Sequence, residues 1–163
     1  MSLGNDERPE SPPLSAEVIY GAIAARRLQF DNLLWQVPVL SLTAQAFLFS
    51  IALAGGSTRY ARTVACVLSI VTSFVSVQAM TRHRQAEIVD AHWLEDLEAT
   101  GPLPGAHGRE WRRRRNETSA EAGVFDPLRH LPGYRTWAIA LATFGLAALL
   151  TLVATWAAPG WLR

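Results

Sequence analysis

Three long apolar blocks without a charged residue limit what this chain can fold into. They cover residues 33–54, 63–80 and 136–158 and contain no Asp, Glu, Lys, Arg or His. An uncharged apolar run of about 18 residues or more is typical of a helix that crosses a membrane. Helices over these blocks would be about 33, 27 and 34 Å long, close to a hydrocarbon core of about 30 Å. The alternative, a soluble bundle of buried helices, is disfavoured because three such blocks occur in only 163 residues.

The connections between the blocks predict how the helices are arranged. Only residues 55–62 separate the first two blocks, so these spans should form an antiparallel hairpin. No Gly or Pro occurs between Met80 and Gly101, so the second helix should continue beyond the membrane to about Ala99. An apolar stripe on this extension needs a partner, which is the N-terminal helix, another subunit or a different protein. Its residues are Ala86, Val89, Trp93 and Leu97.

The segment before the first block predicts an amphipathic helix. Ser15 is a suitable N-cap, and Ile19, Ile23, Phe30 and Leu34 would share one side. This helix would either lie on the inner membrane surface or pack on another cytoplasmic helix. Pro38 implies either a kink near Leu34 or the end of the surface helix at about residue 36, with a fresh span beginning at the proline.

We therefore expect an all-α membrane protein with three transmembrane helices, an N-terminal amphipathic helix and a long cytoplasmic extension of the second span. The chain would divide into four parts. These are a disordered N-terminus (1–13), the amphipathic helix and two-span hairpin with its cytoplasmic helix (14–99), a cytoplasmic basic linker (100–133), and a third transmembrane helix with a short external tail (134–163).

The arginines predict the orientation in the membrane. All 15 basic residues are arginine, which suggests a GC-rich bacterial genome, and no cleavable signal peptide is apparent at the N-terminus. With the N-terminus inside, twelve arginines lie on the cytoplasmic side and three outside, as the positive-inside rule favours. The expected location is the bacterial cytoplasmic (inner) membrane, with the N-terminus inside and the C-terminus outside.

The segment "REWRRRR" is a dense basic cluster in the linker. Arg112, Arg113, Arg114 and Arg115 are candidates for binding anionic lipid headgroups. A purely topogenic role, which needs no ligand, is the alternative. Nucleic acid is not an expected partner, because the cluster is short and tethered to the membrane.

The stretch "SIVTSFVSVQAM" in the second span carries hydroxyls at helical spacing. Ser69, Thr72, Ser73 and Ser76 would occupy an arc of about 100° on a helix. Three residues continue this face toward the inside, namely Met80, His83 and Glu87. The opposite face is rich in valine and would contact lipid. The first span has a comparable line, composed of Pro38, Ser41, Gln45 and Ala52.

Two interpretations of the hydroxyl face remain open. Hydroxyl and amide groups often pack membrane helices against one another through hydrogen bonds. Alternatively, they line a pore at the axis of a homo-oligomer, with Met80 as an apolar constriction and His83 and Glu87 as a vestibule. Three spans are too few to enclose a pore alone, so the second interpretation requires oligomerisation.

The sequence contains little that favours catalysis. His83, Glu87 and Asp90 would share a helix face, but salt bridges with Arg84 and its neighbours explain them better than a metal site. No phosphate-binding loop, zinc-protease motif or nucleophile elbow is present, and the single cysteine, Cys66, cannot form an intrachain disulfide. We expect no enzyme, no cofactor and no metal.

The order of elements resembles a known class of bacterial proteins. An arginine-bearing helix ("AARRLQFDNLLWQVP"), two closely spaced spans and a charged helix ("RHRQAEIVDAHWLEDLE") are similar to the SLATT class of two-transmembrane effector domains. The resemblance covers roughly residues 15–99 and implies action at membranes by pore formation in conflict or defence systems. The third span departs from that layout, and no site residue is transferred.

Two functions follow as expectations. The first is a small integral membrane protein that homo-oligomerises into an ion channel or pore lined by the second span. The alternative is a non-conducting accessory or scaffold subunit that recruits a cytoplasmic protein partner or anionic lipid from the bilayer.

Overall fold

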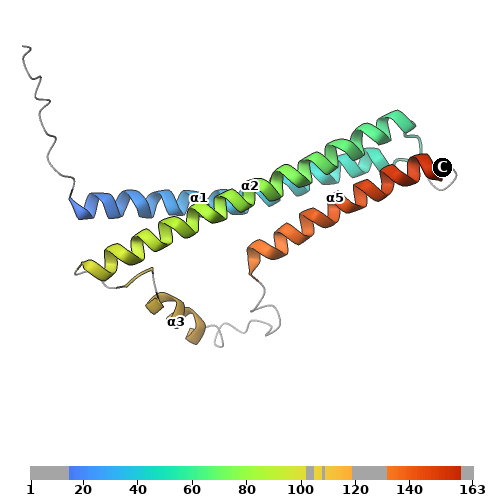
Figure 1. The fold of residues 1–163 in the computed structure, drawn as a ribbon. Coiled ribbons are helices and arrows are strands. Elements are labelled where there is room, and N and C mark those ends of the chain that lie inside the picture. Colours follow the sequence, from blue (N-terminus) through green and yellow to red (C-terminus); the bar gives the residue numbers. More distant parts are fainter. Residues whose placement is uncertain (1–14, 102–104, 108, 119–131, 159–163) are drawn as a thin grey trace, which may run out of the picture.

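The computed structural model describes residues 15–101, 105–107, 109–118 and 132–158 (Figure 1). This part of the chain forms helices and no strand. The helices are α1 (Ala16–Leu53), α2 (Arg59–Thr100), α3 (Arg109–Thr118) and α5 (Gly133–Ala157). The predicted disordered segment, 1–13, and much of the predicted linker lie outside the described residues.

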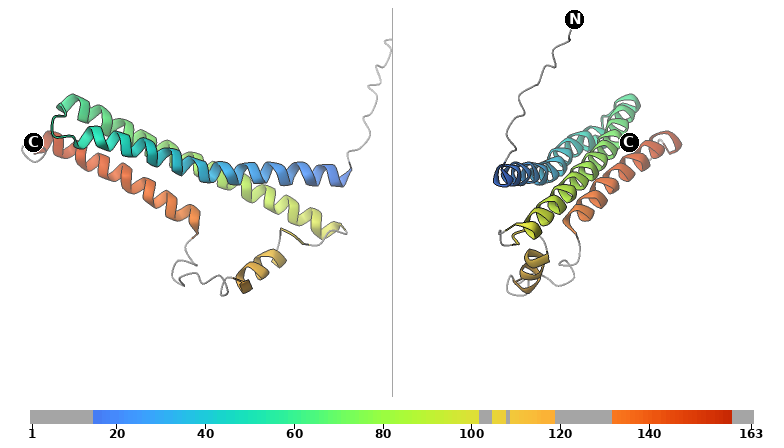
Figure 2. Two further views of the ribbon diagram at one scale, coloured as in Figure 1. Left: turned by 180° about the vertical axis from the view of Figure 1, so that it is seen from behind. Right: turned by 60° about the vertical axis from the view of Figure 1, so that its left-hand side comes forward.

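Three of these helices, α1, α2 and α5, are long and apolar enough to cross a membrane. This confirms an all-helical fold with three helices that could span a membrane, at the positions of the predicted spans. Helix α2 packs along both α1 and α5, whereas α1 and α5 meet over a shorter stretch. Figure 2 shows that the α1–α2 turn and the C-terminal end of α5 lie at one end of the molecule, with α3 toward the other.

Helix α1 is continuous through Pro38, where the sequence allowed either a kink or the end of one helix and the start of another. Ser15 caps it by accepting a hydrogen bond from the Val18 amide at 3.4 Å, as predicted. Pro38 lies inside the helix, where it removes one backbone hydrogen bond and crowds the preceding turn. Figure 2 shows that the axis of α1 changes direction part-way along the helix. The amphipathic segment is therefore the first half of α1 and not a separate surface helix.

Helix α2 has 42 residues and continues without a break to Thr100, as the absence of Gly and Pro predicted. Thr58 caps its start by accepting a hydrogen bond from the Ala61 amide at 3.1 Å. Arg62 lies one turn further on and is buried. Its Nε donates to the Ala52 carbonyl at 2.7 Å, one of the acceptors that the end of α1 leaves open. The turn between the helices is thus held by the Thr58 cap of α2 and by the hydrogen bond from Arg62 to the end of α1.

Two small apolar clusters hold the spans together. The first, near the α1–α2 turn, contains Ala52, Ala65, Cys66 and Ala148, so Cys66 is a small buried side chain. The second consists of Leu34, Met80 and Leu141. Each cluster takes residues from all three spans, and therefore each fixes the position of α5 against the α1–α2 pair.

Helix α5 approaches α2 closely at Gly145. A Cβ atom at this position would lie 3.0 Å from the Cβ of Ser73, so the glycine allows the two backbones to come together. The small residues of α5 differ in their burial. Thr155 is buried, whereas Ala142 and Thr143 are exposed.

Helix α3 was not predicted, because the sequence between residues 100 and 133 shows little periodicity. It contains the whole basic cluster and lies beside the C-terminal part of α2 (Figure 1). Glu110 lies in the first turn, where a negative charge is favourable, and accepts hydrogen bonds from Arg113 and Arg114. Charge pairs within the helix therefore support it where an apolar stripe is missing.

Candidate functional site

A line of polar side chains lies buried between α1 and α2. The Gln45 amide nitrogen donates to the Ser69 carbonyl at 2.9 Å and to the Ser73 hydroxyl at 2.8 Å. The Ser69 hydroxyl donates in turn to the Gln45 amide oxygen. Gln45 is fully buried, and both serines are nearly so. Every polar atom of the Gln45 side chain thus has a partner within the chain, as burial in an apolar medium requires.

The next turn toward α3 continues this line. The Ser41 and Ser76 hydroxyls lie 2.6 Å apart, and Ser41 also donates to the Val37 carbonyl at 2.7 Å. Thr72 is half-buried and no hydrogen bond of its side chain is described. The line of residues predicted on the first span, Pro38, Ser41, Gln45 and Ala52, is the buried face of α1. The predicted lipid-facing side of α2 is exposed, including Val67, Leu68, Val71, Phe74 and Val75.

The three residues that continue the hydroxyl face have different surroundings. Met80 is fully buried and packs with Leu34 and Leu141. His83 is half-buried, with its ring tilted against Phe30 at a centroid distance of 6.2 Å. Glu87 is buried and pairs with two arginines. Within this single chain, the continuation of the hydroxyl face of α2 therefore packs against apolar side chains and forms ion pairs.

Charged residues join α1 to the extension of α2. Arg26 contacts both carboxylate oxygens of Asp90, at 2.6 and 2.9 Å, in the bidentate geometry that favours arginine. Arg27 pairs with Glu87 at 3.3 Å, and Arg84 pairs with the other oxygen of Glu87. The first half of α1 thus packs on another helix, which was one of the two predicted possibilities.

The predicted metal-binding alternative has no structural counterpart in the described residues. Asp90 and Glu87 are engaged by arginines, as the sequence favoured. No group of three or more His, Cys, Asp or Glu side chains that could hold a metal ion occurs within the described ranges.

The apolar stripe predicted on the α2 extension is not covered by α1. Val89 is 48% exposed and Trp93 is 58% exposed. The residues that do face α1 and α3 are the buried Glu87, Asp90 and Glu98 with Leu94. The extension of α2 therefore contacts the rest of the chain mainly through charged side chains. Part of its apolar stripe remains on the surface.

A cluster around Glu98 fastens the segment before α3 to the helix pair. Its Oε1 accepts from the Tyr20 hydroxyl at 2.9 Å and lies 2.8 Å from His107 Nδ1, and its Oε2 accepts from the His107 amide at 3.1 Å. Burial raises the pKa of Glu98, but the hydrogen bonds from His107 and Tyr20 outweigh it, so this pKa lies below its ordinary value. The pKa of Tyr20 is raised, first by burial and then by its hydrogen bond to Glu98.

The four consecutive arginines of the basic cluster, Arg112 to Arg115, divide between two sides of α3. Arg113 and Arg114 pair with Glu110 of the same helix, at 2.9 and 3.1 Å. Arg112 instead reaches Glu95 of α2 at 3.4 Å, and the Arg115 guanidinium lies 5.5 Å from the centre of the Trp111 ring. Both Arg112 and Arg115 line a cavity, whereas Arg113 and Arg114 do not.

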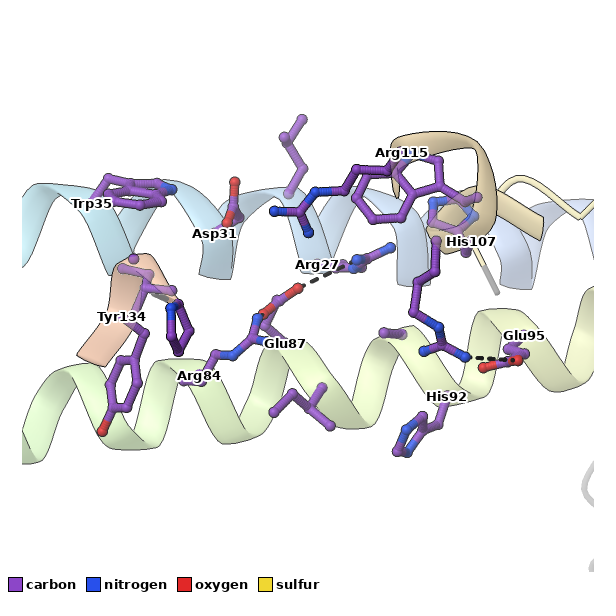
Figure 3. A pocket seen from close by; sticks show the side chains of 18 of the residues that line it. Arg27, Asp31, Trp35, Arg84, Glu87, His92, Glu95, His107, Arg115 and Tyr134 are labelled. Atoms are coloured by element: carbon purple, nitrogen blue, oxygen red, sulfur yellow. Dashed lines mark hydrogen bonds and ion pairs between the residues drawn. The ribbon is translucent and has the colours of Figure 1, made fainter. Parts of the chain in front are cut away.

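This cavity has a volume of about 910 Å³ and lies among α1, α2, α3 and the start of α5 (Figure 3). Figure 3 shows Arg27 from α1, Glu87 from α2 and Arg115 from α3 directed toward the same space. Five arginines line the cavity, and only three carboxylates do. These residues are Arg27, Arg84, Arg112, Arg115 and Arg135 against Asp31, Glu87 and Glu95.

The sequence did not predict this cavity. Its walls come from four segments that are far apart along the chain. The periodicity of one helix does not indicate which distant segments pack beside it. The one available signal was Trp35 and Tyr134, aromatic residues at the ends of apolar blocks, which mark the depth at which the cavity lies.

Comparison with known proteins provides no relative. No protein-family model matches the chain, and no curated protein or solved structure shows significant similarity to it. The resemblance to the SLATT class therefore stays a prediction.

Proposed function

We propose that the chain is a non-conducting integral protein of the bacterial cytoplasmic membrane that gathers anionic lipid, and through it partner proteins, at the inner face. The orientation has the N-terminus inside and the C-terminus outside. The observation that carries this proposal is the burial of Ser69, Ser73 and Ser76 against Gln45 and Ser41 within one chain. Groups that already hydrogen-bond one another have little capacity to hydrate an ion.

The end of the molecule that holds α3 supports the lipid part of the proposal. Arg113 and Arg114 are exposed, and each arginine near an anionic surface contributes about 1 kcal/mol of attraction. Glu110 and Glu117 reduce the net charge of this surface, since they pair with the same arginines. The exposed Val89 and Trp93 on α2 provide a surface for a protein partner.

The homo-oligomeric pore stays the second proposal. It is favoured by the continuity of the polar line that joins Ser41 and Gln45 to the serines of the second span, which it follows over about two turns. To conduct, the line would have to separate from α1 and face a symmetry axis. The two proposed functions therefore differ in whether the protein conducts ions.

Reconstitution into liposomes tests the proposal. The purified protein, with its oligomeric state determined by cross-linking, should produce no ion flux above that of empty liposomes. Lipid that co-purifies in mild detergent should be enriched in anionic species relative to the source membrane. Ion flux from a confirmed oligomer would establish the pore and overturn the non-conducting function.

A further inference from the structure

The cavity among α1, α2, α3 and α5 carries more positive charge than its own carboxylates neutralise. Arg27 and Arg84 share one partner, Glu87, and Arg112 pairs with Glu95. Within the described part of the chain, the Arg115 guanidinium lies over the Trp111 ring with no ion pair, and no ion pair of Arg135 is found there either. The surplus positive charge favours an anion in this space.

The remaining lining is suited to the apolar part of a ligand. Trp35 and Trp111 present indole rings, and Leu28, Leu34 and Ile88 add aliphatic surface. The Tyr134 hydroxyl is already held by Thr81, at 2.7 Å. A volume of about 910 Å³ is within the range of sites that bind small molecules, roughly 300–1,000 Å³.

The cavity lies where the apolar blocks end. Trp35 is at the start of the first block and Tyr134 just precedes the third, so the cavity is at the depth of lipid headgroups. Arg27 and Arg84 lie beyond the apolar parts of α1 and α2, and Arg115 lies in the polar helix α3. A molecule with a charged head and an apolar tail could place its head among these arginines and its tail beside the apolar parts of the helices.

We propose that this cavity binds a phosphate ester that carries hydroxyl groups, with Arg27, Arg84, Arg115 and Arg135 around the phosphate. Guanidinium groups bind phosphate oxygens through paired hydrogen bonds. Asp31, a carboxylate without a described partner, is repelled by the phosphate and accepts instead from a hydroxyl of the ligand. This inference rests on the proposed lipid function and specifies its chemistry.

Two sources supply this chemistry, a phosphatidylglycerol headgroup and soluble glycerol phosphate. Binding of dioctanoyl phosphatidylglycerol, dioctanoyl phosphatidylcholine and glycerol phosphate to the full chain in detergent, measured by native mass spectrometry, separates them. We expect phosphatidylglycerol to bind at least about tenfold more tightly than phosphatidylcholine, since only the first has a net negative charge. Equal binding of glycerol phosphate would support the site and identify a soluble ligand.

A matched pair of double variants tests the location. Arg115→Ala with Arg135→Ala should weaken phosphatidylglycerol binding at least about tenfold, because both cavity arginines without a carboxylate partner are lost. Arg113→Ala with Arg114→Ala removes equal charge from the exposed surface of α3, outside the cavity, and should weaken phosphatidylglycerol binding several times less than the cavity pair does. Circular dichroism of both variants checks that the helices form.

The outcomes distinguish this inference from the proposed function. Equal weakening by both double variants would overturn the cavity site and leave a surface attraction of α3 for anionic lipid, which the proposed function allows. No preference for phosphatidylglycerol over phosphatidylcholine in the unaltered chain would overturn both.

Discussion

Glu98 shows how a single residue can join three parts of the chain. It receives hydrogen bonds from Tyr20 of α1 and from His107 before α3, and it belongs to α2 itself. Its carboxylate is nearly buried, so these donors replace the water that it loses. We therefore expect the position of α3, and with it one wall of the cavity, to depend on this carboxylate remaining ionised.

This arrangement predicts a pH dependence. Because the pKa of Glu98 is lowered on folding, its contribution is fully present above the ordinary value of 4.5 and is lost as pH falls through the lower folded value. At pH 7, Glu98→Gln should reduce stability by about 1–2 kcal/mol, since charge-assisted hydrogen bonds become neutral ones. The thermal midpoint in detergent and amide exchange over α3 measure this loss.

The difference between Glu98→Gln and the unaltered chain should shrink as pH falls below about 4.5. A difference that is the same at pH 7 and pH 3.5 would show that the carboxylate charge does not fasten α3.

Helix α5 is held against α2 by a close backbone approach. Gly145 faces Ser73 with no room for a larger side chain, and the Trp156 indole donates to the Thr63 hydroxyl at 3.2 Å further along the same pair. Hydrophobic burial contributes little between helices within lipid, so such close packing and hydrogen bonds account for their association.

Gly145→Leu should therefore separate α5 from α2. We expect a loss of about 1–3 kcal/mol from overpacking, seen as a lower thermal midpoint in detergent. Gly21→Leu is the matched control, because a Cβ atom at Gly21 would meet nothing within 4 Å. The control should be neutral or stabilising by up to about 1 kcal/mol, as leucine is the better helix former. Equal losses in both variants would contradict the close approach.

The extent of the long helices could be predicted from the sequence, whereas their contacts could be predicted only in part. The absence of Gly and Pro after Met80 indicated the length of α2, and helical spacing indicated the buried faces with Gln45 and Ser73. Helix α3 was missed because its stability comes from charge pairs and not from an apolar stripe. Of the three partners expected for the stripe with Trp93, the N-terminal helix contacts the carboxylates of α2 instead, and the other two stay predictions.

The three spans lie side by side, with α2 packed along both α1 and α5 (Figure 2). The α1–α2 turn lies at one end, and α3 with the cavity lies toward the other (Figure 2). The excess of arginine at the α3 end predicts that this end is cytoplasmic.

Cysteine labelling tests this orientation in intact cells. In a Cys66→Ala background, Gly56→Cys in the α1–α2 turn should react with a membrane-impermeant maleimide, and Glu117→Cys in α3 should react only after permeabilisation. We expect at least about a tenfold difference in labelling before permeabilisation, because the positive-inside rule places α3 in the cytoplasm. The reverse pattern would place the N-terminus outside, and with it the cavity.

The unbroken length of α2 has a mechanical consequence. At about 1.5 Å per residue its 42 residues extend about 63 Å, roughly twice the hydrocarbon thickness. A rigid helix of this length tilts as one body, so tilting of its membrane-embedded part also moves the part outside the bilayer. Its arm at the α3 end, residues 81–100, is about 30 Å long, so a tilt of about 10° displaces the far end by about 5 Å. A change in membrane thickness, which helices accommodate by tilting, would therefore be converted into movement of Glu95 and Glu98 relative to the lipid surface.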